Sequence, residues 1–265
     1  MPVKIDGNGP ITGLGPAGQC RLVLSAGNIV LQPYQGDLLC VGGANIELPP
    51  AGVTLAPAGL AVGALLYVYA SYPGSVWTLT AEATVPTADA VNGSQIKTGD
   101  PLKALVGMVY LKTGPVFADT AAARLVASWF NPRPRSCANF YTAVSPAADK
   151  TNTSYAELDA AARVEFLTWG DAVNMGAGFS FINSGANTVA AGIAFDGIAL
   201  GEQAAGFAHA NNLTNSLSAR ASPELARGYH YATMVQRQTG GTTTWWGNSA
   251  GFQTERCAIN GTVNI

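Results

Sequence analysis

The sequence predicts an all-β protein with two parts, an N-terminal β-rich domain and a C-terminal β-sandwich of the jelly-roll kind. Its apolar residues occur in short runs rich in Val, Ile, Leu, Tyr and Trp, which is the pattern of strands. Glycine (31) and proline (15) are frequent enough to end many such runs. Only 11% of the 265 residues are charged, so long amphipathic helices lack the Glu, Lys and Arg that they require.

The N-terminal domain is expected to follow an extended tail, residues 1–20, which has too few large apolar groups to fold alone. The Pro-Gly pair within Tyr72–Ser75 predicts a tight turn that joins two strands as a hairpin. The domain is expected to cover residues 21–145. Its strands, of the usual length of about five or six residues, are expected at 21–25, 28–32, 37–41, 65–70, 75–80, 104–110 and 124–130.

The chain changes character after these strands. Asn131–Ser136 contains two prolines and two arginines, which predicts a corner or an exposed edge. Val144–Ser154 has no strand pattern and is typical of a linker, so we expect the domain boundary near residues 145–155. Two segments with good helix propensity, Thr120–Arg124 and Glu157–Ala162, are too short to organise a fold.

The C-terminal domain, residues 155–265, has the size and strand density of one β-sandwich. A jelly roll is favoured over an immunoglobulin fold because Cys137 and Cys257 straddle the expected linker. Thr239–Gly241 predicts a turn that joins two of the strands as a long hairpin. The strands are expected at 163–169, 177–183, 189–197, 229–236, 242–247 and 256–265.

Composition argues against several classes of protein. The net charge is −2, without the basic stripe that binds nucleic acid. No apolar run approaches the roughly 20 residues of a spanning helix, and Asp6 stands where a signal peptide has its apolar core. Cysteine spacing excludes a CxxC metal knuckle. We therefore expect no membrane insertion, no export by that route, no metal and no cofactor, and free thiols at Cys20, Cys40, Cys137 and Cys257.

Two enzyme motifs occur in the sequence without the structural context that they require. Gly247–Gly251 fits the GxSxG nucleophile elbow, but no helix has room to follow Ser249, and His209 and His230 both precede it. Gly13–Gly18 spells GxGxxG without a strand before it. A pair of carboxylates for glycoside hydrolysis stays open, because that chemistry needs only two acids at a suitable separation. The sequence nevertheless predicts a protein that is not an enzyme.

The C-terminal half is rich in aromatic and amide side chains, the residue types that bind sugars. Neighbouring residues of a strand point to opposite faces, so of the two adjacent indoles one is expected in the core and the other outward, against a ligand or a neighbouring subunit. His230, between two tyrosines, is expected to be a hydrogen-bonded structural histidine rather than a general base. The candidate ligand-binding residues are Trp245, Trp246, Tyr229, His230 and Asn248.

Several segments together resemble bacteriophage and prophage (or gene-transfer-agent-like) virion fibre proteins. In the first 145 residues these segments are Ile5–Leu14, Leu66–Ala70, Lys97–Asp100, Leu105–Val109 and Ser128–Arg135. Gly228–Thr233 and the pair Trp245–Trp246 are similar to the jelly-roll tips of such head or tail fibres.

The resemblance implies a virion structural fibre or spike that assembles in the bacterial cytoplasm. Its N-terminal part would dock on the capsid, collar or tail, and its C-terminal sandwich would recognise a bacterial surface polysaccharide. It also implies a homo-oligomer, most often a trimer. The alternative is a purely structural head-decoration, collar or adaptor subunit that binds only protein.

Overall fold

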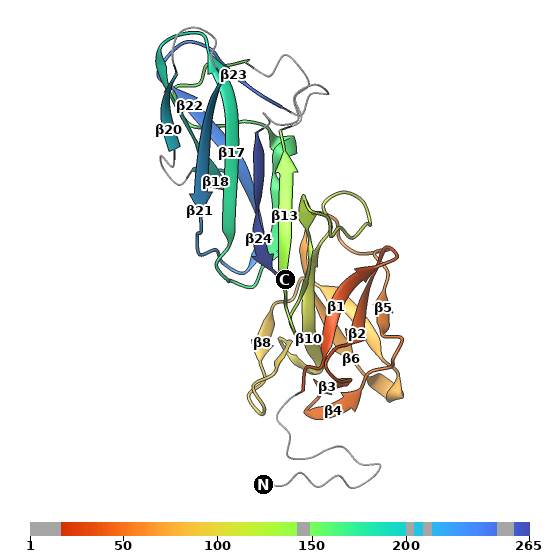
Figure 1. The fold of residues 1–265 in the computed structure, drawn as a ribbon. Helices are drawn as coiled ribbons and strands as arrows, with labels where there is room; N and C mark the ends of the chain where they lie inside the picture. The colour runs from red at the N-terminus through yellow and green to blue at the C-terminus, as the bar shows by residue number, and fades with distance from the viewer. Residues whose placement is uncertain (1–16, 142–148, 200–203, 209–213, 248–256) are drawn as a thin grey trace. The chain divides into compact units, whose positions relative to one another are not determined.

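The computed structural model describes residues 17–141, 149–199, 204–208, 214–247 and 257–265 (Figure 1). It is all-β, with 58% strand and 3% helix, which confirms the predicted fold class. The helices in the described ranges are two 3₁₀ turns, η1 (Pro73–Ser75) and η2 (Ala160–Ala162). None of these helices is long enough to cross a membrane.

The chain forms two compact units. The first comprises residues 1–119, 125–133 and 265, and the second comprises residues 120–124 and 134–264. The chain therefore passes from the first unit to the second mainly at the predicted corner around Pro134, and not at the expected linker near 145–155. The reason is pairing: β13 (Pro134–Phe140) pairs along its whole length with β24 (Ala258–Asn264) in the second unit.

The first unit is built from short antiparallel strands that meet around one apolar core. One sheet has the order β1-β2-β5, a second pairs β3 with β4, and the largest has the order β7-β6-β10-β9-β8 with β12 also pairing β10. The bounds are β1 (Cys20–Ser25), β2 (Asn28–Pro33), β3 (Leu38–Val41), β4 (Ala44–Glu47), β5 (Val53–Leu55), β6 (Leu65–Ser71), β7 (Thr78–Glu82), β8 (Pro86–Ala88), β9 (Gln95–Lys97), β10 (Asp100–Tyr110) and β12 (Val126–Ser128).

Local sequence explains the turns of this unit. Ala26 and Gly27 both have positive φ, as a two-residue hairpin loop requires, and they join β1 to β2. The predicted Pro-Gly turn is confirmed, because β6 and β7 pair up to Ser71 and Thr78 on either side of it. Gly107 has no room for a side chain, since a Cβ would lie 2.5 Å from the Ala127 carbonyl oxygen.

The second unit is a sandwich of two antiparallel sheets, apart from one short parallel edge. The β22 sheet has the order β11-β16-β22-β18-β19, with β15 pairing β22 and β20 pairing β18. The β17 sheet has the order β13-β24-β17-β23-β14, with β21 pairing β17. The bounds are β11 (Ala123–Arg124), β14 (Asp149–Lys150), β15 (Ala156–Glu157), β16 (Val164–Thr168), β17 (Asn174–Asn183), β18 (Asn187–Phe195), β19 (Ile198–Ala199), β20 (Ala204–Ala208), β21 (Asn215–Ala221), β22 (Gly228–Gln238) and β23 (Thr243–Trp245).

The long strands of this unit pass back and forth between the two sheets, as in a jelly roll. From β13 the chain crosses to β16, then to β17, then to β18, and after β20 it returns through β21 to β22 and finally to β24. The expected hairpin at Thr239–Gly241 is wrong, because β22 and β23 belong to opposite sheets. The glycine turn exists, with Gly241 at φ 70°, but it carries the chain across the sandwich.

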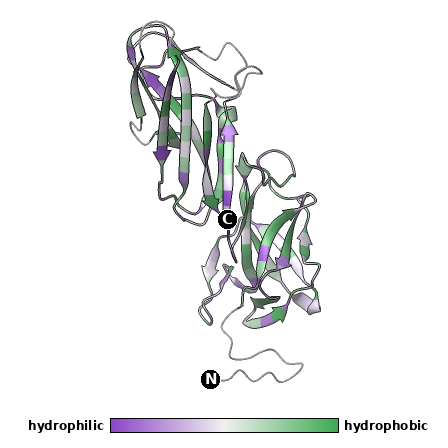
Figure 2. Ribbon diagram, in the orientation of Figure 1, coloured by the Kyte–Doolittle hydropathy of each residue, from purple (hydrophilic) through white to green (hydrophobic). Residues whose placement is uncertain are grey.

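The interior of the sandwich follows strand alternation. In β17 every second residue is buried, including Met175, Ala177, Phe179 and Phe181. The intervening residues of β17 are exposed or half-buried, so one face of this sheet packs in the core and the other faces outward. Figure 2 shows hydrophobic residues recurring along the strands of both units.

Candidate functional site

The two adjacent tryptophans take opposite environments. Trp245 is fully buried at 0% exposure, with ring centroids 4.9 Å from Phe181 and 5.9 Å from Phe179. It belongs to the core of the jelly roll and cannot stack on a sugar. Trp246 is half-buried, and its backbone N–H donates to the Ser180 carbonyl at 2.9 Å. The alternation therefore places Trp246, not Trp245, toward the outer side of the β17 sheet.

Tyr229 and His230 are held by the fold. The Tyr229 hydroxyl donates to Glu165 Oε1 at 2.7 Å. His230 Nδ1 lies 2.6 Å from Asp196 Oδ2, and its Nε2 lies 2.8 Å from the Ala226 carbonyl oxygen. Both ring nitrogens thus have partners within the unit, as predicted for a structural histidine.

The predicted ligand-binding residues do not form one site. Tyr229 and His230 lie at the start of β22, whereas Trp246 follows β23 in the opposite sheet (Figure 1). Asn248 lies outside the described residues, as do Ser249 and His209. The expected cluster of an exposed indole with polar companions is therefore not assembled by Trp245, Trp246, Tyr229 and His230.

A polar network covers one end of the β22 sheet. Arg163 donates to both carboxylate oxygens of Glu157 at 2.7 Å, and the Thr233 hydroxyl donates to the same group at 2.6 Å. The Arg163 guanidinium also lies 4.1 Å from the centroid of the Tyr231 ring. The Arg163 bond holds the pKa of Glu157 below its usual value. This network is closed on itself, so it links strands rather than offering groups to a ligand.

Burial raises the pKa of all four cysteine thiols. All four are free and buried, as predicted. Burial raises the pKa of the Cys20 and Cys257 thiols to about 12 and that of Cys137 to about 11. At neutral pH these side chains are therefore thiols and not nucleophilic thiolates. In the part of the chain that the structure describes, no three His, Cys, Asp or Glu side chains gather as a metal site.

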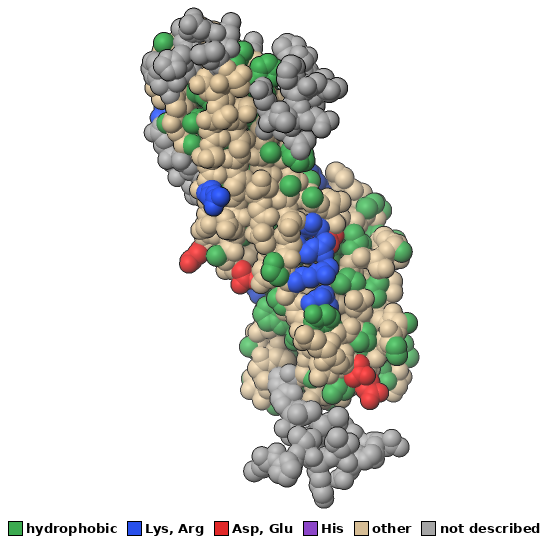
Figure 3. All heavy atoms as spheres, in the orientation of Figure 1, with side chains coloured by type: hydrophobic (Ala, Val, Ile, Leu, Met, Phe, Trp, Pro, Cys, Tyr) green, Lys and Arg blue, Asp and Glu red, His purple; other side chains and the backbone are tan. Residues whose placement is uncertain are grey.

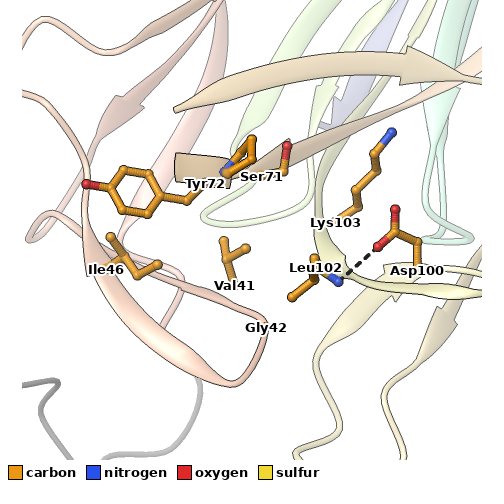
Figure 4. A pocket seen from close by; sticks show the side chains of 9 residues that line it. Val41, Gly42, Ile46, Ser71, Tyr72, Asp100, Leu102 and Lys103 are labelled. Atoms are coloured by element: carbon orange, nitrogen blue, oxygen red, sulfur yellow. Dashed lines mark hydrogen bonds between the residues drawn. The ribbon is translucent and has the colours of Figure 1, made fainter. Parts of the chain in front are cut away.

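A pocket of about 410 Å³ opens in the first unit (Figure 4). It lies between the β3–β4 hairpin, the end of β6 and the start of β10. Its walls are largely apolar, and polar groups stand at its rim. The lining residues are Val41, Gly42, Ile46, Ser71, Tyr72, Pro73, Asp100, Leu102 and Lys103.

The start of β10 shapes the rim of this pocket. Pairing with β9 is irregular between Asp100 and Ala104, and Leu102 is left 63% exposed there. Asp100 Oδ1 accepts a hydrogen bond from the Leu102 N–H at 3.1 Å. Lys103 Nζ donates to Glu82 Oε1 at 2.5 Å. The pattern of strands in the sequence does not predict this pocket, because its residues come from three separate segments.

The outer face of the β17 sheet is a second surface of note, and we call it the flat face. Residues that pair across neighbouring strands, such as Gly176 with Asn260 and Gly178 with Ser218, lie on the same face of the sheet. Arg220 is the one charged residue among the eleven positions named below, and Figure 3 shows a surface of mostly polar and backbone atoms there. The flat face consists of Asn174, Gly176, Gly178, Ser180, Ile182, Ser216, Ser218, Arg220, Ala258, Asn260 and Thr262.

Comparison with known proteins adds little about function. No family model matches the chain, and no curated protein matches it. Among solved structures, Eiger TNF from S. frugiperda is similar over 50% of this chain and 94% of its own, with a TM-score of 0.34 and 14% identity. Dimeric latent PorU from Porphyromonas gingivalis matches 89% of this chain and 20% of its own, at TM-score 0.31 and 12% identity.

A structure of infectious bursal disease virus, Gx strain, is similar over 95% of this chain and 68% of its own. The TM-score is 0.30 and the identity is 13%. The similar structures thus include a TNF protein and a viral protein. At these scores they carry no argument about activity, so the function must be argued from the geometry of this chain.

Proposed function

We propose that the chain is a structural subunit of a virion, of the fibre or spike type, and that it assembles as a homo-oligomer through the flat face. Three copies are the expected number, because the fibres that the sequence resembles are commonly trimers. The observation that carries the proposal is Gly178. It lies in the middle of β17, exposed, and no atom of the described residues is within 4 Å of where a Cβ would stand.

No contact among the residues that the structure describes accounts for glycine at this position. Its φ lies outside the left-handed region, so the backbone accepts any residue, and a side chain would have open space. Glycine in a strand lowers stability and marks places where another chain approaches closely. Gly261 gives the contrast, because there a Cβ would lie 2.2 Å from the Asn174 carbonyl oxygen. Gly178 therefore fits a surface that a second copy covers.

The rest of the flat face supports the same partner. Glycine in a strand lets another backbone approach closely, and interface centres are depleted of Lys, Glu and Asp. Arg220 stands at one side, on β21, and the neighbouring positions are Ser, Gly, Asn, Ala and Thr. Trp246 lies beside Ser180 on this sheet and is already half-buried within one copy, so it does not by itself distinguish a subunit contact from a sugar contact.

The environments of the candidate ligand-binding residues bear on the two functions that the sequence leaves open. Glycan binding by the C-terminal sandwich was expected to depend on Trp245 or Trp246 with Tyr229, His230 and Asn248. Trp245 is core, and Tyr229 and His230 are bonded within the fold. The structural-subunit function is therefore the better supported one.

The test is the mass of the full chain in solution and its response to Gly178→Arg. Light scattering at micromolar concentration should give about 82 kDa, three times the 27.2 kDa chain. Gly178→Arg should give 27.2 kDa with an unchanged strand signal in circular dichroism, because a Cβ at this exposed position has open space among the described residues.

Thr54→Arg is the matched control, since Thr54 is an exposed strand residue of the first unit. It should leave the oligomer intact. A monomeric wild type, or an oligomer that survives Gly178→Arg, would show that the flat face is not the interface.

A further inference from the structure

We infer that the pocket of the first unit binds a neutral saccharide, one or two pyranose rings long. This site lies in the N-terminal part and not in the C-terminal sandwich where a glycan was expected. It does not depend on the oligomer proposed above. Its volume of about 410 Å³ is in the range of small-molecule sites.

The apolar part of the pocket suits the C–H face of a sugar ring. Val41 and Ile46 come from the β3–β4 hairpin, and Leu102 closes the opposite wall. The Tyr72 ring lies beside Ile46 at one end (Figure 4). Tyr72 is itself positioned by Trp77, whose ring centroid is 4.9 Å away, and Trp77 Nε1 donates to the Glu47 carbonyl at 2.8 Å. The aromatic end is thus held in place before any ligand arrives.

The polar part of the rim favours neither sign of charge in a ligand. Figure 4 shows Asp100 and Lys103 together at the end away from Tyr72. A ligand with a formal charge would meet one like and one unlike charge there, and the two effects oppose each other. Hydroxyl groups both donate and accept, so a sugar can donate to Asp100 and accept from Lys103 at the same time.

Both charged groups are already fixed by the protein. One Asp100 oxygen accepts from the Leu102 N–H, and Lys103 is bonded to Glu82, which Lys97 also contacts. Neither group must therefore be ordered when a ligand binds, which lowers the entropic cost of binding. Gly42 lies against Leu102 in this wall, since a Cβ on Gly42 would be 2.8 Å from Leu102 Cδ2.

The experiment is ligand-observed saturation-transfer NMR on the full chain. The probes are the methyl pyranosides of glucose, galactose and mannose, with glucuronate, glucosamine and cyclohexanol as comparators. At least one methyl pyranoside should receive saturation, strongest on the protons of one ring face. A dissociation constant of about 1 mM is expected for a ligand of about 13 non-hydrogen atoms.

Three variants locate the site. Asp100→Asn keeps an oxygen for the Leu102 N–H but removes the charge, and it should weaken the sugar about tenfold. Tyr72→Ala should weaken it by about three- to tenfold. Val91→Ala is the control, because Val91 is 89% exposed and does not line the pocket. Leu102→Trp is a third variant, at an exposed position, and it should block the pocket without disturbing the core.

Three results would overturn the inference. One is the absence of saturation for every methyl pyranoside at 10 mM, roughly ten times the expected dissociation constant. Another is binding that persists in both Asp100→Asn and Leu102→Trp. The last is cyclohexanol or a charged sugar binding as well as the neutral pyranosides, because the rim would then not be recognising several hydroxyls.

Discussion

The two units stabilise their interiors in different ways. Among the described residues, the first unit buries one polar side chain, Ser128, and the second unit buries several. Those of the second unit are Glu165, Thr168, Asn183, Thr233, Gln236, Gln238 and Thr243. The first core is a cluster of aliphatic residues such as Leu31, Val68 and Val106. Apolar contacts are tolerant of rearrangement, but buried polar groups must each find a partner. The interior of the second unit thus combines apolar residues with specific hydrogen bonds, such as Asn183 to Thr243 and Gln236 to Asn152. The Oε1 atoms of Gln236 and Gln238 have no partner among the described residues. The interior of the first unit is almost wholly apolar.

The largest effect that separates the units is expected from Trp245→Ala. Removing a fully buried indole should lower the stability of the second unit by about 3–5 kcal/mol. Hydrogen exchange followed by mass spectrometry should show lost protection in β17, β22 and β23, with the first unit unchanged. Leu31→Ala is the counterpart in the first unit, at a cost of about 2–5 kcal/mol. Protection lost equally in both units after either change would mean that they do not unfold separately.

A smaller effect is expected from Asn183→Leu, which adds apolar surface to the second unit yet should destabilise it by about 1–3 kcal/mol. Asn183 Nδ2 donates to Thr243 Oγ1 at 2.7 Å, and its Oδ1 accepts from the Gly185 N–H at 2.9 Å. The substitution leaves the buried Thr243 hydroxyl without this bond.

Urea denaturation of the variant measures this loss. Thr98→Val serves as the control, because its hydroxyl bond to the Val85 carbonyl is exposed, and it should change stability by less than about 0.5 kcal/mol. A stabilised Asn183→Leu protein would show that the second core, like the first, depends only on volume.

The smallest expected effect is the loss of stability of the first unit at acid pH. Hydrogen bonds from Lys103 and Lys97 lower the pKa of Glu82 to about 2. Because the folded pKa lies below the unfolded value, this contribution is complete above pH 4.5 and is lost as the pH falls toward 2. The pair is partly exposed, so the loss should be at most about 1 kcal/mol. Melting temperatures between pH 5 and 2 should show it in the wild type.

Glu82→Gln should flatten this part of the acid dependence of the first unit, and Glu157→Gln should do the same for the second unit. The direction for Glu157 follows from its own lowered pKa beside Arg163. An acid dependence of the first unit that is unchanged in Glu82→Gln would show that other carboxylates are responsible.

Much of the fold was predictable from local pattern. Runs such as 28–32 and 177–183 alternate in burial as expected, and the Pro-Gly turn after β6 joins a hairpin. Trp245 and Trp246 take opposite sides because strand geometry requires it. What could not be predicted is the partner of each strand. Thr239–Gly241 has the same turn chemistry whether the next strand returns to its own sheet or crosses to the other one.

The all-β class, the many turns and the corner near Pro134 could be predicted from the amino-acid sequence, because these features depend on residues close together in the chain. Which residues share a surface depends instead on how distant strands pair. Tyr72, Asp100 and Val41 line one pocket, and Gly178 faces outward beside Ser218, through pairings between distant strands. Such pairings are selected by the packing of the whole core. No local run of residues contains enough information to predict them.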